Sequence, residues 1–356
     1  MVQNILITGG AGYIGGTLIA DFLARTSGPI KAANISTAVR SEEQVQALSN
    51  LGINVIKVDL SEEKAVLKAV LDNNIDIIVH IASSMSASMA SHLLKALGQR
   101  RKISGEEVHF IHSSITTIFA PESGWPYGPV RDSDLLFEKM SQLEKGHPVR
   151  DTDLFVIEEA KSQGITSFTV NVPVVYGRGS GEMKKISVFL PALINASIKH
   201  KVVYKFDKNA TPPTAHVSDL SALYILLVEN IVQGVPTPSG DKGYYFGVSH
   251  TIDWWETTQC IAEALHARGL VAEPKVQIWP SDEMAAEYLG FPPACMGGEL
   301  TSLSGEFDPV NAHQLGWQRK WDKKKFLDNI DDEVAAVLEL QNFNPSVFDT
   351  LMPSGK

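Results

Sequence analysis

A glycine-rich segment near the N-terminus is the part of the sequence most indicative of chemistry. Thr8-Gly9-Gly10-Ala11-Gly12-Tyr13-Ile14-Gly15 follows an apolar run, Asn4–Thr8, and precedes apolar residues at helical spacing. This arrangement is typical of loops that bind a dinucleotide pyrophosphate at the positive end of a helix. Gly9 would form the tight turn, Gly12 would let the backbone approach the phosphates, and Gly15 would let the helix pack on the strand. A tight turn without a ligand is the alternative interpretation.

The residues after the second expected strand indicate which dinucleotide the loop binds. An NAD-binding chain usually carries Asp or Glu about 20 residues beyond the glycines, where the carboxylate binds the ribose 2′-OH. Here Arg40 and Ser41 occupy that place. An arginine fork with a neighbouring hydroxyl suits a 2′-phosphate, whereas Glu42 and Glu43 fit better in the first turn of a helix. We therefore expect NADP(H), with NAD(H) as the alternative cofactor. If this is wrong, Arg40 is an ordinary surface charge.

The elements that must position these groups alternate between strand-like and helix-like segments through the first half of the chain. This alternation implies right-handed crossovers and a parallel sheet. We therefore predict an α/β fold: a Rossmann-type doubly wound parallel sheet with a smaller, mixed C-terminal substrate-binding region. The expected strands are Asn4–Thr8, a weaker one within Ile30–Arg40, Ile53–Val58, Ile75–Ile81, Val108–His112 and Ser167–Val172.

The second half of the chain is less regular, and it sets the expected domain organisation. It contains a Gly/Pro-rich stretch at 234–243 and a helix-like segment, Trp254–Ala267, without a clear linker. We predict that residues 1–177 form the NADP-binding core and that residues 211–233 return to it. Residues 178–356 should mainly form the substrate-binding region, interleaved with the core.

The composition limits the class of protein. The chain has 356 residues, a formal net charge of −10, 44% hydrophobic residues and 20% charged residues, as in an ordinary globular enzyme. The negative charge disfavours nucleic acid and anionic membranes as partners. No apolar run approaches the roughly 20 residues that cross a bilayer, and no secretory signal pattern is visible. Two cysteines, without Cys/His clustering, indicate neither a disulfide framework nor a metal site. We expect a cytoplasmic protein that binds a small molecule and is compatible with a homodimer.

Further motifs occur in a recognisable order along the chain: Asp59-Leu60, His80-Ile81-Ala82, Pro173-Val174-Val175-Tyr176-Gly177, His216-Val217-Ser218-Asp219-Leu220 and Leu315-Gly316-Trp317. With the glycine loop, they make nearly the whole chain resemble the extended short-chain dehydrogenase/reductase family, which includes nucleotide-sugar epimerases and dehydratases. Asp59 could instead cap the following helix. Together the loop and the resemblance predict these cofactor-binding residues: Thr8, Gly9, Gly12, Tyr13, Ile14, Gly15, Arg40, Ser41, Asp59, Leu60, Ile81, Ala82, Ser83, Ser113, Pro173, Val174 and Val175.

The catalytic pattern of that family is incomplete in this sequence. Its usual chemistry needs a Tyr-x-x-x-Lys pair on one helix and a Ser or Thr at a strand end. The strand end is present as Ser113-Ser114-Ile115-Thr116-Thr117, but the family's hydroxyl position falls on or beside Ile115, so Ser114 and Thr116 are both candidates. No tyrosine between Ser114 and Tyr176 has a lysine four residues later.

Counting back from the Pro173 loop places His147 and Asp151 where the tyrosine and lysine would be. We predict that His147 supplies the missing proton, because a carboxylate one turn later would favour imidazolium. Pro148 suits the first helical position, which would put His147 at the N-cap, where the helix dipole lowers its pKa. A polar loop residue before a helix is the alternative interpretation of His147.

Three functions remain open from the sequence. The leading one is an atypical NADP(H)-dependent reductase or dehydrogenase that acts on a small or mid-sized carbonyl or unsaturated compound. The first alternative is a cofactor sensor or scaffold that has kept the dinucleotide site and lost catalysis. The second is an isomerase or epimerase that uses bound cofactor without net oxidation. The absent Tyr-x-x-x-Lys pair favours the sensor, and the hydroxyl-rich strand end with a nearby histidine favours the enzyme.

Overall fold

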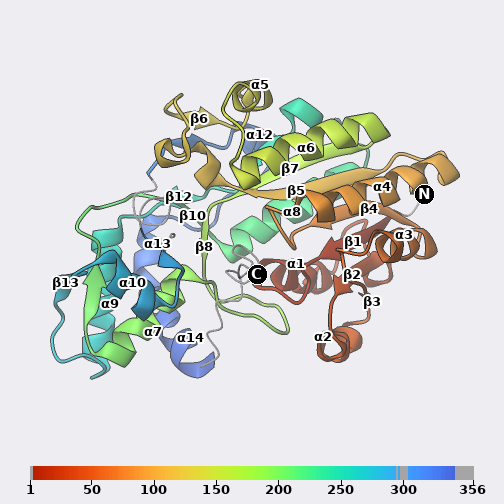
Figure 1. Ribbon diagram of the computed structural model, residues 1–356. Helices are drawn as coiled ribbons and strands as arrows, with labels where there is room; N and C mark the ends of the chain where they lie inside the picture. The colour runs from red at the N-terminus through yellow and green to blue at the C-terminus, as the bar shows by residue number, and fades with distance from the viewer. Residues whose placement is uncertain (1–2, 294–295, 297–303, 341–356) are drawn as a thin grey trace.

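A seven-stranded parallel sheet forms the centre of the molecule (Figure 1). The structure is a computed structural model that describes residues 3–293, 296 and 304–340. The strand order is β11-β7-β5-β4-β1-β2-β3, and every pairing within this sheet is parallel. The predicted doubly wound α/β fold is therefore confirmed. The strands are β1 (Asn4–Thr8), β2 (Ile35–Val39), β3 (Asn54–Lys57), β4 (Ile75–His80), β5 (His109–Ile115), β7 (Thr166–Val172) and β11 (Tyr244–Phe246).

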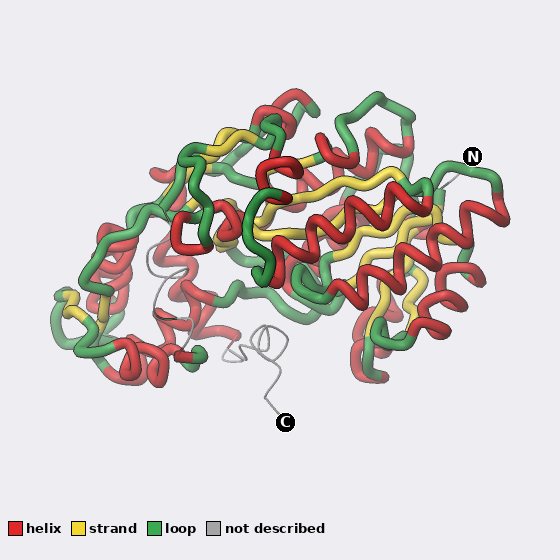
Figure 2. The backbone as a smooth tube through the Cα atoms, turned by 45° about the horizontal axis from the view of Figure 1, so that its top comes forward, coloured by secondary structure: helices red, strands yellow, loops and turns green. Residues whose placement is uncertain are grey.

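Helices cover both faces of the sheet, which is why successive residues in the middle of the central strands β1 and β4 are apolar (Figure 2). The covering helices are α1 (Tyr13–Ala24), α3 (Glu63–Asp72), α4 (Ala87–Ser104), α6 (Pro148–Gln163) and α8 (Val217–Val232), and α2 (Glu42–Leu48) joins β2 to β3. Ile5 and Ile7 of β1 pack with α1 and α8, whereas Leu6 between them packs with α3, α4 and α6.

The second half of the chain contributes to this core and also builds a smaller lobe. Strand β11 comes from residues 244–246 and adds an edge to the sheet beside β7. The lobe has its own apolar core, which includes Leu193, Trp254, Ile261 and Val334. Within the described ranges, no helix is both long and apolar enough to cross a bilayer.

The lobe and its connections contain short strands and several helices. The strands are β6 (Val130–Arg131), β8 (Val174–Tyr176), β9 (Val203–Lys205), β10 (Pro213–His216), β12 (His250–Thr251), β13 (Val276–Ile278) and β14 (Phe307–Asp308). The helices are α5 (Leu136–Ser141), α7 (Phe189–His200), α9 (Trp254–Ala267), α10 (Asp282–Leu289), α12 (Val310–Gln314), α13 (Lys323–Asp328) and α14 (Ile330–Leu340).

One buried carboxylate ties the sheet edge to the C-terminal part of the chain. Asp132, which is fully buried, accepts hydrogen bonds from the backbone N–H groups of Asn311 (2.7 Å), Phe246 (3.1 Å) and Ala312 (3.3 Å). In return, the side-chain amide of Asn311 donates to the carbonyl of Asp132 at 2.9 Å. These bonds join the segment after β6 to β11 and α12.

We expect Asp132→Asn to lower the free energy of unfolding by about 2–4 kcal/mol, because the new NH₂ group would face backbone donors in a buried site. Urea denaturation measures this change. Asp134→Asn is the matched control, since Asp134 is only partly buried and pairs with Lys139, and it should cost less than about 1 kcal/mol. Equal stability of the two variants would contradict this assignment.

Candidate functional site

The glycine loop turns the chain sharply from β1 into α1. Gly9 has φ +76°, the left-handed region that glycine tolerates best. Gly12 is the N-cap of α1 with φ −86° and ψ 176°, and a Cβ added there would meet only the carbonyl oxygen of Gly9, at 3.0 Å. A Cβ on Gly15 would overlap the same carbonyl group, lying 2.8 Å from its carbon. Gly9 therefore makes the turn, Gly15 permits the close approach, and Gly12 leaves open space above the loop.

The first turn of α1 is suited to an anion. The N–H groups of Tyr13, Ile14 and Gly15 stand in the first helical turn, where no intrahelical acceptor exists. The glycine at the N-cap provides no side chain to accept from them, and no acidic residue lies in the first turn. Unpaired N–H groups next to a glycine whose missing side chain leaves space fit the pyrophosphate of a dinucleotide.

The loop after β4 contacts the glycine loop where the strand order reverses. The hydroxyl oxygen of Thr8 accepts from the backbone N–H groups of Ile81 (3.1 Å) and Ala82 (3.2 Å). It also lies 2.9 Å from Nδ1 of His80. A Cβ on Gly9 would lie 3.2 Å from the backbone of Ala82. In open α/β sheets, ligands bind at the carboxyl ends of the strands beside this reversal, which here lies between β1 and β4.

Arg40 and Ser41 follow β2 at the same edge. Ser41 is the N-cap of α2 and accepts from the backbone N–H of Gln44, while the exposed guanidinium of Arg40 forms no hydrogen bond with another described residue. Asp59, after β3, accepts from the backbone and hydroxyl of Ser61. These bonds, and the nearby charge of Arg40, lower the pKa of the Asp59 carboxyl. A free, exposed cation therefore stands where the sequence predicts the 2′-phosphate.

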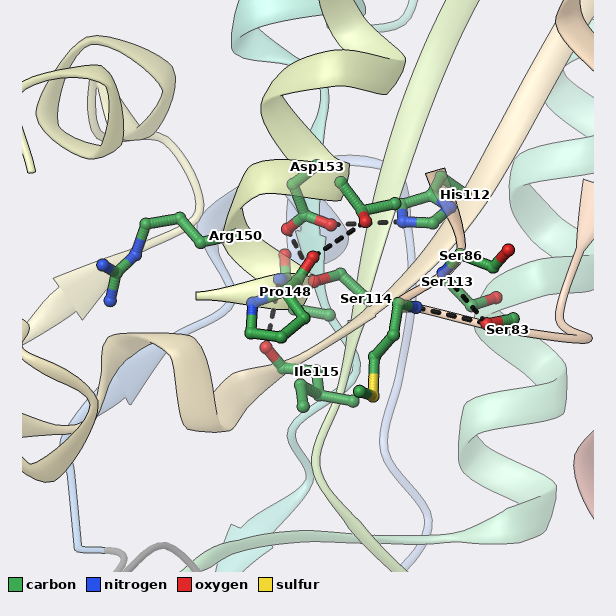
Figure 3. A network of polar contacts seen from close by, with 12 residues as sticks. Ser83, Ser86, His112, Ser113, Ser114, Ile115, Pro148, Arg150 and Asp153 are labelled. Atoms are coloured by element: carbon green, nitrogen blue, oxygen red, sulfur yellow. Dashed lines mark hydrogen bonds and ion pairs between the residues drawn. The ribbon is translucent and has the colours of Figure 1, made fainter. Parts of the chain in front are cut away.

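Two predicted hydroxyls at the end of β5 already have partners inside the protein. Ser113 lies 2.6 Å from the hydroxyl of Tyr224 on α8. Ser114 faces the opposite side of the sheet and donates to Oδ2 of Asp153 at 2.6 Å (Figure 3). Ser114 is 1% exposed. Its proton is therefore committed to a buried carboxylate on α6.

Asp153 also contacts His112, so one carboxylate gathers two side chains of β5. Oδ1 of Asp153 lies 3.1 Å from Nε2 of His112, and both residues are fully buried (Figure 3). His80, the neighbour of His112 across the sheet, stacks on it at 5.9 Å, and burial lowers the pKa of His80 to about 3. Our sequence reasoning missed Asp153. The available signal was an acidic residue on the apolar face of the helix, four positions after Val149 and three before Val156.

Two threonine hydroxyls remain without partners at this strand end. Oγ1 of Thr116 and Oγ1 of Thr117 are buried and form no hydrogen bond with another described residue. Ile115, on or beside which the family's hydroxyl was expected, is partly exposed. A buried hydroxyl without a partner costs about 1–3 kcal/mol, so each threonine keeps a hydrogen-bonding group that the described part of the protein does not use. Thr116 was predicted from the sequence and Thr117 was not.

His147 and Asp151 have the contacts of a helix N-terminus. His147 is the N-cap of α6 and Pro148 is the first helical residue, as the preference of proline for that position predicts. Its Nδ1 accepts from the backbone N–H of Arg150 at 3.3 Å. Oδ2 of Asp151 accepts from the backbone N–H of Gly146 at 2.8 Å. With Nδ1 accepting at the cap, Nε2 is the ring nitrogen of His147 that can donate a hydrogen bond to another group.

The remaining predicted residues complete the same edge. Leu60 is buried after β3, and the hydroxyl of Ser83 accepts from the N–H groups of Met85 and Ser86 (Figure 3). Pro173 directly precedes β8, which contains Val174 and Val175. Because all sheet strands are parallel, the predicted segments at their carboxyl ends lie along one edge. The hydroxyls of Ser113 and Ser114, by contrast, turn to opposite faces of the sheet.

Part of the chain that contains the glycine loop matches a known protein family. Residues 5–106 match the model of the family described as "NAD dependent epimerase/dehydratase family". A search of curated proteins finds no significant match.

The fold is similar to several solved enzymes over nearly its whole length. Thermus thermophilus UDP-glucose 4-epimerase, in complex with NAD, has a TM-score of 0.62 and 17% identity, covering 94% of this chain and 99% of that one. Bacillus cereus UDP-glucuronic acid 4-epimerase, in complex with UDP-glucuronic acid and NAD, has a TM-score of 0.64 and 17% identity, and the match covers 95% of this chain and 100% of that one. A partial consensus L-threonine 3-dehydrogenase has a TM-score of 0.60 and 13% identity, and the match covers 95% of this chain and 99% of that one. At these identities the similarity establishes the fold alone.

Two alanine substitutions separate the roles of the glycines. We expect Gly12→Ala to fold normally and to weaken NADPH binding at least tenfold, because the new methyl group occupies space that the phosphates need. Gly15→Ala should instead destabilise the protein by about 1–3 kcal/mol, because its Cβ overlaps the Gly9 carbonyl. Calorimetric titration and thermal unfolding measure the two effects. Unchanged NADPH affinity in Gly12→Ala would mean that the loop is only a turn.

Proposed function

We propose that the protein is an NADP(H)-dependent oxidoreductase of the extended short-chain type, on the premise that residues 5–106 match the model of the NAD-dependent epimerase/dehydratase family. Its substrate would be a small or mid-sized carbonyl or unsaturated compound. Residues 1–177 with 211–233 would carry the cofactor, and the rest of residues 178–356 would mainly cover the substrate. The observation that carries the proposal is the glycine-capped first turn of α1 at the reversal of strand order.

The choice of NADP(H) rests on Arg40. Its guanidinium is exposed at the end of β2 and forms no hydrogen bond with a described residue, so it is available to a 2′-phosphate. The hydroxyl of Ser41 accepts at the α2 cap and still has a proton to donate. The carboxylate of Asp59 stays ionised beside Arg40 and would hold it in place. The two epimerases described above were solved with NAD, which at their low identity does not decide the cofactor here.

The chemistry of the proposed reaction divides between cofactor and chain. The bound nicotinamide would supply or accept a hydride. Thr116 and Thr117 would donate hydrogen bonds to the substrate oxygen, since their hydroxyls have no other described partner. His147 would supply the proton that the family's tyrosine usually gives; for this it would act as an imidazolium, with Nδ1 protonated and released from the N–H of Arg150, and would become a neutral imidazole after the transfer. Asp151 would help to order the turn before α6. Ser114 would act through Asp153, because its proton already points to that carboxylate.

The bond from Ser114 to Asp153 also favours a second candidate function. A family member whose strand-end serine is buried and whose Tyr-x-x-x-Lys pair is missing has the features of a cofactor-binding sensor or scaffold. The isomerase alternative draws on the fold relatives that are epimerases. Both alternatives predict no net consumption of NADPH.

A single substitution tests the cofactor preference. We expect the unmodified protein to bind NADPH more tightly than NADH, and Arg40→Ala to weaken NADPH about 10- to 100-fold while NADH changes less than about twofold, because one charge-assisted contact is lost. Titration of cofactor fluorescence measures the affinities. Arg25→Ala is the control, because Arg25 follows the far end of α1 and pairs with Glu229. Equal affinity of the unmodified protein for both dinucleotides would rule out the preference.

Turnover separates the three functions. We expect oxidation of NADPH, followed by its absorbance, with at least one member of a panel of aldehydes, ketones and enones. Thr116→Val and Thr117→Val should each lower kcat about tenfold or more, because a donor to the substrate oxygen is lost. Thr166→Val, at the opposite end of the sheet, is the control. Tight NADPH binding without turnover would support the sensor function. Isomerisation of a substrate without loss of NADPH would support the isomerase function. Wild-type turnover of His147→Gln between about pH 5 and 8 would exclude His147 as proton donor.

A further inference from the structure

One residue, Gly177, lies between the glycine loop and helix α14. The backbone N–H of Gly177 donates to Oε1 of Glu333 on α14 at 2.6 Å. The carbonyl oxygen of the same residue accepts from the hydroxyl of Tyr13, the first residue of α1, also at 2.6 Å. Glu333 and Tyr13, which are 320 positions apart in the sequence, are therefore joined through a single residue.

The conformation of Gly177 is tightly determined. It follows β8 with φ +96°, a region that side-chain-bearing residues rarely adopt. A Cβ at this position would overlap the imidazole of His216. Gly177 therefore has little room to move, and its two hydrogen bonds link the position of one partner to that of the other.

The segment after Gly177 rests directly on α1. A Cβ on Gly181 would lie 2.7 Å from the backbone carbonyl carbon of Gly16, and one on Gly179 would lie 3.1 Å from the ring of Tyr13. The hydroxyl of Ser180 donates to Asp21 of α1 at 2.9 Å. This packing holds the outer side of the first turns of α1, whose N–H groups face the proposed phosphate site.

Glu333 is a buried acid with few partners. Its exposed fraction is 3%, and it forms no ion pair with a described lysine, arginine or histidine. Tyr13 of α1 and Tyr176 of β8 are the ionisable groups that face it, and Asp332 is its acidic neighbour on α14. Burial raises the pKa of Glu333 to about 7, and the hydrogen bond from Gly177 opposes this rise. Burying a carboxyl group on an apolar helix face costs free energy. We therefore look for the role of Glu333 in its hydrogen bond with the backbone of Gly177.

We propose that Glu333 is a positioning residue for the dinucleotide: through Gly177 it holds Tyr13 and the first turn of α1 in the conformation that binds the pyrophosphate. The inference rests on the proposed function, since the bound group is NADP(H). Removal of the carboxylate leaves the Gly177 N–H buried without an acceptor. Gly177 then shifts, Tyr13 loses its acceptor, and the N–H groups at the start of α1 are less well ordered for an anion.

The test compares Glu333→Ala, Glu333→Gln and Tyr13→Phe. Titration of NADPH gives the affinity, and hydrogen exchange of residues 9–18 in the ligand-free protein reports the order of the loop. We expect Glu333→Ala and Tyr13→Phe each to weaken NADPH about tenfold and to speed exchange in this segment. The double variant should be no worse than either single one, because both act through the same residue, Gly177. Glu333→Gln should stay within about threefold of wild type, since its amide oxygen still accepts from Gly177.

Asp332→Ala is the matched control, because Asp332 is the exposed acidic neighbour on the same helix, and it should leave affinity and exchange unchanged. Wild-type exchange and affinity in Glu333→Ala would overturn the proposal. So would equal losses in Glu333→Gln and Glu333→Ala, which would indicate a role for the charge alone. If Glu333→Ala does not fold, Tyr13→Phe decides by the same two measurements. A wild-type protein that binds neither dinucleotide would contradict the proposed function, while the exchange comparison would still decide the link from Glu333 to the loop.

Discussion

The close approach of α1 to the end of β1 is the constraint on which the rest of the site depends. Gly15 packs against the carbonyl of Gly9 at a distance that excludes any side chain. This contact sets the start of α1 beside the reversal of strand order and directs its unpaired N–H groups to the edge of the sheet. Thr8 extends the same arrangement by binding two N–H groups of the loop after β4.

The polar groups along this edge divide into those that the fold uses and those that it leaves available. Asp153 binds both His112 and Ser114, and Tyr224 binds Ser113, so these groups hold the two faces of β5. The guanidinium of Arg40 and the hydroxyls of Thr116 and Thr117 have no such partners among the described residues. This division explains why recognition by sequence motif alone overstates the role of the serines: a strand alternates its side chains between faces, and only the surroundings decide which one meets a ligand.

Much of the fold followed from the sequence because its signals are local. The apolar run Asn4–Thr8 and the glycine spacing after it depend on neighbours within a few residues, and β1 has the expected bounds. The partners of Ser114 and Gly177 were not predictable in the same way, because Asp153 and Glu333 lie 39 and 156 residues away. Both are acids on the apolar face of a helix, which signals a buried partner without identifying it. Strand β11 was missed because three residues are too short for a periodic pattern.

The most direct test of the account is a crystal structure of the protein with NADPH. We expect the pyrophosphate to accept hydrogen bonds from the backbone N–H groups of Tyr13 and Ile14, and the 2′-phosphate to pair with the guanidinium of Arg40. The nicotinamide should lie beside the end of β5, within reach of Thr116 or Thr117. A dinucleotide bound elsewhere, or bound at the loop with its 2′-phosphate turned away from Arg40, would contradict it.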